Sequence, residues 1–158
     1  MSRPTVAVVD LKSLRSNFAL AQSLAPGANA IPMVKANAYG HGMIEVSRAL
    51  AESAPAFGVA SIDEALTLRQ AGIQQPILLL EGTFSCDEVA IAADNNFMLM
   101  VENLVQNDAI VNASISQPII VWLGIDTGMH RLGFQPKEAI QAYQALKNSD
   151  NVAKPIIA

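Results

Sequence analysis

Short apolar runs alternate along the chain with longer stretches in which apolar residues recur at helical spacing. The short runs are rich in β-branched residues and are bounded by Gly, Pro, Asn or Ser, which is typical of buried strands. Because helices are expected to fill the intervals, the pattern predicts an α/β protein with a parallel sheet. The predicted strands are residues 5–9, 31–35, 57–60, 76–81, 97–101, 118–126 and 155–158.

Helix boundaries can be predicted from capping residues. Asp10 is expected to cap a first helix, which Pro26 and Gly27 end. In a capping box, a hydroxyl and a carboxylate three residues apart each satisfy an otherwise unpaired backbone N–H group at the start of a helix. Two later helices are expected to begin with such boxes and a third with a proline at its first position: Ser61 with Glu64, Ser85 with Glu88, and Pro136.

The number of βα units leaves two architectures open. Counted from residue 31, six strands follow one another, whereas a closed (β/α)8 TIM barrel needs eight strands and about 250 residues. The first interpretation is an incomplete barrel of about five to six βα units over residues 31–158, preceded by an N-terminal strand and helix in residues 1–30. A doubly wound open sheet fits the same pattern, and periodicity alone does not exclude it.

Composition narrows the class of protein. The chain has 10 Lys and Arg against 14 Asp and Glu, a net charge of −4, which argues against nucleic-acid binding. The uncharged stretches at residues 18–34 and 109–125 are shorter than a membrane helix requires, so no membrane span is expected. Without a signal-like segment at the N-terminus, a cytoplasmic location is expected. The single Cys86 provides no metal-ligand pair, and no metal site is predicted.

The most unusual local sequence places Lys35 at the end of a predicted buried strand, followed by small residues. This end of a parallel strand is where α/β folds keep their active sites. Apolar surroundings favour the neutral amine, which is a nucleophile that forms a Schiff base with an aldehyde cofactor. For an isolated lysine, however, extension of the side chain into water is the commoner arrangement.

Two motifs carry a resemblance to a known family. Residues 34–42, Val-Lys-Ala-Asn-Ala-Tyr-Gly-His-Gly, resemble the pyridoxal-phosphate attachment motif of the alanine racemase family, which consists of fold type III enzymes. Residues 125–134, Ile-Asp-Thr-Gly-Met-His-Arg-Leu-Gly-Phe, resemble a second motif of that family. Weaker similarity lies between them, so the resemblance covers essentially the whole chain. It favours the barrel, which in the family is followed by a β domain that this chain is expected to lack.

The resemblance implies an isomerase that interconverts L- and D-alanine and supplies D-alanine for peptidoglycan. Lys35 is expected to carry pyridoxal 5'-phosphate and to act as a base on one face of the substrate. Tyr39 is expected to contact the phosphate, and Arg131 the phenolic oxygen of the cofactor and the substrate carboxylate. Without the motifs, Tyr39 would be interpreted as covering the strand end and Arg131 as an ion pair with Asp126.

The sequence also departs from the family. Gly124 occupies a position where many members carry a lysine modified to a carbamate that orients the arginine. The second base, expected from a partner subunit in a dimer, belongs to regions that follow those matched here. Little activity is therefore expected from these 158 residues alone. Two alternatives remain: a non-catalytic protein that carries pyridoxal phosphate on Lys35, and a structural fragment without cofactor.

Overall fold

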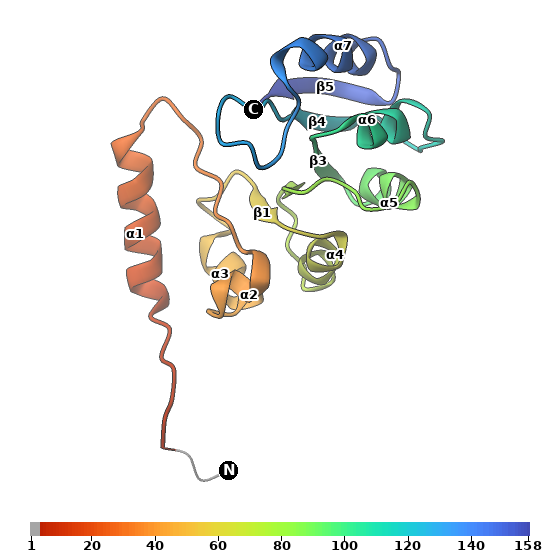
Figure 1. Ribbon diagram of the computed structural model, residues 1–158. Coiled ribbons are helices and arrows are strands. Elements are labelled where there is room, and N and C mark those ends of the chain that lie inside the picture. Colours follow the sequence, from red (N-terminus) through yellow and green to blue (C-terminus); the bar gives the residue numbers. More distant parts are fainter. Residues whose placement is uncertain (1–3) are drawn as a thin grey trace.

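A computed structural model describes residues 4–158, and it contains a five-stranded parallel sheet (Figure 1). The strands lie side by side in chain order, from β1 to β5, and every neighbouring pair is parallel. A doubly wound sheet reverses its strand order at a switch point, whereas a barrel does not. The order therefore favours the partial barrel. The strands are β1 (Phe57–Val59), β2 (Ile77–Leu79), β3 (Phe97–Val101), β4 (Ile119–Leu123) and β5 (Val152–Ile157).

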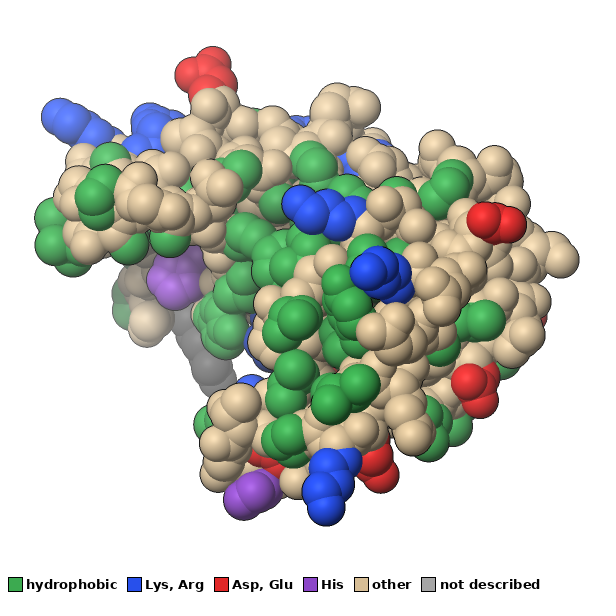
Figure 2. All heavy atoms as spheres, turned by 90° about the horizontal axis from the view of Figure 1, so that it is seen from above, with side chains coloured by type: hydrophobic (Ala, Val, Ile, Leu, Met, Phe, Trp, Pro, Cys, Tyr) green, Lys and Arg blue, Asp and Glu red, His purple; other side chains and the backbone are tan. Residues whose placement is uncertain are grey.

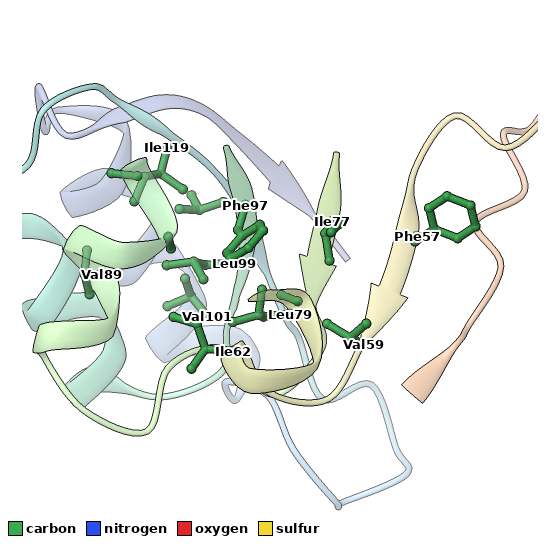
Figure 3. Packing of buried hydrophobic residues seen from close by; sticks show 14 of the residues in the cluster. Phe57, Val59, Ile62, Ile77, Leu79, Val89, Phe97, Leu99, Val101 and Ile119 are labelled. Carbon is green, nitrogen blue, oxygen red and sulfur yellow. The ribbon is translucent and has the colours of Figure 1, made fainter. Parts of the chain in front are cut away.

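Helices cover one face of this sheet and bury alternate residues of each strand. Successive strand side chains point to opposite faces, so Val59, Leu79 and Leu99 face the helices, where all three are fully buried (Figure 3). Leu78 and Met98 face the other side and form a smaller apolar cluster with Ala56. The covering helices are α4 (Ile62–Gln70), α5 (Asp87–Asp94), α6 (Leu104–Val111) and α7 (Pro136–Lys147).

Three helices precede the sheet: α1 (Leu11–Leu24), α2 (Lys35–Tyr39) and α3 (Met43–Leu50). Asp10 caps α1 as predicted, because its carboxylate accepts hydrogen bonds from the backbone N–H groups at positions 12 and 13. Leu14 and Phe18 pack against the main core. None of the described helices is long and apolar enough to cross a membrane. The division at residue 30 stays a prediction, and residues 1–3 of that unit lie outside the described residues.

Two predicted strands are wrong. Residues 5–9 are extended but belong to no strand, and the side chains of Val6 and Val8 are exposed. In the segment 31–35 only Met33 pairs, through one isolated parallel bridge to Gly58 of β1. A strand forms only where a neighbour offers backbone groups to pair with, and an apolar pattern does not reveal whether one is present.

Capping residues predict where the helices begin more accurately than they predict the hydrogen bonds of the caps. Pro136 is the first residue of α7, as expected. Ser61 precedes α4 but its side chain makes no capping bond. Helix α5 begins at Asp87 after Cys86, and the carboxylate of Glu88 accepts from the N–H of Phe84. Both capping boxes are therefore wrong in detail, because each glutamate binds a backbone group outside its box.

Candidate functional site

A pocket of about 490 Å³ opens at the carboxyl ends of the strands. Its walls come from Met100 in β3, from residues that follow β2, β3, β4 and β5, and from the loop before α7, together with Lys35. Catalytic sites of parallel α/β folds lie at this end of the strands. The lining residues are Lys35, Leu80, Glu81, Met100, Glu102, Gly124, Ile125, Met129, Arg131, Leu132 and Ala158.

Two of the three predicted site residues meet in this pocket. Lys35 and Arg131 both line it, although they are 96 positions apart in the sequence. Tyr39 is 61% exposed and does not line the pocket. From above, hydrophobic side chains gather across the middle of the molecule, with Lys and Arg side chains among them (Figure 2). The chemical roles of Lys35, Tyr39 and Arg131 stay predictions.

The backbone immediately after Lys35 is left-handed. Ala36, Asn37, Ala38 and Tyr39 all have φ between 50° and 56°, so α2 is a left-handed turn. This conformation costs about 1–2 kcal/mol per residue for L-amino acids, and it persists only where the surrounding structure enforces it. The side-chain oxygen of Asn37 accepts from the N–H of Met43 at 2.9 Å, which contributes to holding the turn.

Hydrogen bonds at the end of the turn join it to α3. The N–H of Gly42 donates to the carbonyl of Asn37 at 3.0 Å, and the ring nitrogen Nδ1 of His41 lies 3.0 Å from the carbonyl oxygen of Ala38. Gly40 and Gly42 have φ values of 89° and 90°, which glycine adopts without steric cost. The turn thus begins at Lys35 on the pocket wall and ends shortly before α3.

Two acidic residues of the pocket were not predicted from the sequence. Glu81 and Glu102 both line it, and each follows a buried strand directly or by one residue, which is the signal that would have found them. Burial raises the pKa of the Glu102 carboxyl, the charge of Glu81 raises that pKa further, and the charge of Arg131 lowers it. The pocket therefore holds two acids, one lysine and one arginine.

Glu102 lies beside Gly124. A Cβ atom at Gly124 would lie 3.4 Å from Cγ and 3.8 Å from Oε1 of Glu102. An alanine at position 124 would therefore make ordinary van der Waals contact with the glutamate. The resemblance implied a lysine-derived anion at this position, and here a carboxylate from the neighbouring strand end lies beside it.

Asp126 organises the loop that carries Arg131. Its Oδ1 accepts hydrogen bonds from the backbone N–H groups of Gly128 at 3.0 Å and His130 at 2.9 Å. Its Oδ2 lies 2.7 Å from Nδ1 of His130 and 3.2 Å from Nε2 of Gln135. The contact between Asp126 and His130 is the one salt bridge found within residues 4–158, and it is an ion pair only while the imidazole is protonated. The alternative interpretation of Arg131, an ion pair with Asp126, is therefore not supported.

The carboxyl of Asp126 is expected to titrate with a pKa of about 2, because the N–H groups of His130 and Gly128 stabilise its charge. A lowered pKa stabilises the fold fully above the ordinary value near 3.8, and this contribution is lost as the pH falls through 2. NMR of the side-chain carboxyl carbon of Asp126 as a function of pH measures this pKa. In His130→Ala the backbone N–H remains, so the pKa should rise only partway. Titration near 3.8 in the unaltered protein would contradict this expectation.

Comparisons with known proteins agree on one family. The family described as "Alanine racemase, N-terminal domain" matches residues 9–157. The chain is 44% identical over 155 residues to an alanine racemase of Pseudomonas fluorescens, covering 98% of this chain and 43% of that protein. It is 48% identical over 150 residues to an alanine racemase of Hamiltonella defensa, covering 95% and 42%. The chain thus spans less than half the length of these curated relatives.

Solved structures of alanine racemases are similar to this chain in fold. The biosynthetic alanine racemase from Pseudomonas aeruginosa superposes with a TM-score of 0.94 and 41% identity, over 98% of this chain and 43% of that one. For the alanine racemase from Acinetobacter baumannii the TM-score is 0.85 and the identity 35%, over 94% and 42%. These similarities, together with the strand order, confirm the predicted partial TIM barrel.

Proposed function

Since the chain belongs to the alanine racemase N-terminal domain family, we propose that its pocket forms part of an active site that interconverts L- and D-alanine with pyridoxal 5'-phosphate. One observation carries the proposal: Lys35 and Arg131, each from a motif that resembles the family, line the same pocket at the carboxyl ends of the strands. The proposal extends to D-alanine supply for peptidoglycan, which the resemblance implies, and to the cytoplasmic location that the sequence analysis expects.

The pocket residues suit this cofactor. Lys35 provides an amine at the wall for an aldehyde, and Arg131 provides a planar donor fork for an anionic oxygen. Pyridoxal phosphate, when bound, withdraws electrons from the α-carbon of an amino acid and so makes its proton acidic. Glu81 and Glu102 line the same pocket, and their negative charges would disfavour an anionic phosphate close to them.

The residues of the chain would perform three tasks. The Nζ atom of Lys35 would remove or return the α-proton on one face of the substrate. The guanidinium of Arg131 would hold the substrate carboxylate and thereby orient the α-carbon toward Lys35. Inversion needs a second base on the opposite face, which the proposal assigns to the partner subunit of a homodimer, in regions that follow those matched here.

The proposal is tested by incubating the purified protein with pyridoxal phosphate and L-alanine and by separating the alanine enantiomers over time. Because the second base belongs to regions that follow those matched here, D-alanine is expected to form slowly, and Arg131→Lys should slow its formation at least tenfold, because an ammonium lacks the planar fork. Lys147→Arg, at the exposed end of α7, is the matched control. Cofactor uptake without D-alanine would support the non-catalytic alternative, and absence of uptake would contradict the proposal.

A further inference from the structure

The carboxylate of Glu64 binds two backbone groups that do not belong to its own helix. Glu64 lies in the first turn of α4, where the sequence predicts that it caps the helix together with Ser61. Instead, Oε1 accepts a hydrogen bond from the N–H of Ala36 at 2.6 Å, and Oε2 accepts one from the N–H of Ala60 at 2.8 Å. A single side chain therefore ties the segment after Lys35 to the residue after β1.

The N–H of Ala36 belongs to the peptide group that begins with the carbonyl of Lys35. Because a peptide group is planar, fixing this N–H also fixes the carbonyl of Lys35 and restricts the orientation of its Cα–Cβ bond. The N–H groups at the start of a helical turn have no partner within the turn. A carboxylate is a strong partner for such a group, because a hydrogen bond to a charged acceptor is shorter and stronger than one between neutral groups.

The conformation of the turn makes this contact important for the geometry of the pocket. Four consecutive left-handed residues follow Lys35, and each would be more stable in a right-handed conformation. Release of the N–H of Ala36 would remove one of the contacts that hold the turn where it begins. The bond to Ala60 anchors the same carboxylate at the carboxyl end of β1, so the turn is placed relative to the sheet.

We propose that Glu64 is a positioning residue for Lys35: its carboxylate fixes the backbone of the left-handed turn and thereby directs the amine of Lys35 into the pocket. The inference rests on the proposed function, since it concerns the lysine to which pyridoxal phosphate would attach. Glu64 itself does not line the pocket. In this proposal it acts through the backbone of Ala36.

The test compares Glu64→Gln and Glu64→Ala with Asp63→Ala, which removes the same charge from the neighbouring, exposed position of α4. Pyridoxal phosphate is titrated into the purified protein, and the adduct is trapped with borohydride and quantified by intact mass. Loss of a hydrogen bond to a charged group should weaken uptake roughly ten- to hundredfold in Glu64→Ala. Glu64→Gln keeps the size and one acceptor oxygen and should fall between, whereas Asp63→Ala should match the unaltered protein.

Amide hydrogen exchange gives a second readout that needs no cofactor. Ala36 lies on an exposed turn, yet its N–H should exchange slowly in the unaltered protein and much faster in Glu64→Ala. Fast exchange of this N–H in the unaltered protein would overturn the inference. Equal uptake by Glu64→Ala and Asp63→Ala would also overturn it and leave the proposed function intact, whereas absence of any adduct in the unaltered protein would overturn the proposed function.

Discussion

Replacing Lys35 with alanine is expected to abolish covalent attachment of pyridoxal phosphate and to leave the free energy of unfolding nearly unchanged. Lys35 is the one lysine among the residues that line the pocket, so no other amine there can replace it. Its side chain is half-buried at the pocket wall and lies outside the apolar core. Substitutions at such positions change stability by about 0.5 kcal/mol or less.

The measurement is the intact mass of the protein before and after borohydride reduction with added pyridoxal phosphate. The unaltered protein should gain the mass of one reduced cofactor, and Lys35→Ala should gain none. Lys147→Ala, at the exposed end of α7, is the control and should gain the same mass as the unaltered protein. An adduct of equal yield in Lys35→Ala would show that another lysine reacts, and the assignment of Lys35 would then be wrong.

The second large effect concerns stability, at Gly82 after β2. Gly82 has a φ of 67°, and a Cβ atom there would overlap the backbone carbonyl oxygen of Met100 and lie 2.7 Å from Nε2 of Gln106. That Nε2 donates to the carbonyl of Glu81 at 2.7 Å, while Oε1 of Gln106 accepts from the N–H of Glu102 at 2.9 Å. Alanine at position 82 would therefore strain the backbone and displace the glutamine that joins the two acidic strand ends.

Gly82→Ala is expected to lower the free energy of unfolding by about 2–5 kcal/mol, the sum of left-handed strain and overpacking. Gly72→Ala is the matched control, because Gly72 has a φ of 88° but no atom within 4 Å of the Cβ position. It should lose only about 1–2 kcal/mol. Urea denaturation measures the free energy of unfolding of both variants. The two should differ in the urea concentration at the midpoint, while the dependence of the free energy on urea concentration stays unchanged. Equal losses in the two variants would show that the contact with Met100 is relieved without cost.

Much of the fold could be predicted from local patterns. The apolar runs that become β1 to β4, the cap at Asp10 and the proline that begins α7 all carry their signal within a few neighbouring residues. Strand order is different, because it depends on which distant segments exchange backbone hydrogen bonds. The same limit explains the error at residues 5–9, whose apolar alternation finds no strand to pair with in the structure.

For the candidate site too, the sequence predicts some features and only the tertiary structure shows the others. The two motifs and their positions after apolar runs place Lys35 and Arg131 among the site residues from the sequence alone, together with the family that they resemble. Only the tertiary structure shows that Glu64 binds the N–H of Ala36, that the turn after Lys35 is left-handed, and that Glu102 lies beside Gly124. Each of these depends on a contact between residues more than twenty positions apart, or on backbone strain that such contacts maintain. Local residue propensities reflect neither the contacts between distant residues nor the backbone strain that those contacts maintain. The sequence therefore determines the type of site, while the packing of distant segments determines its geometry.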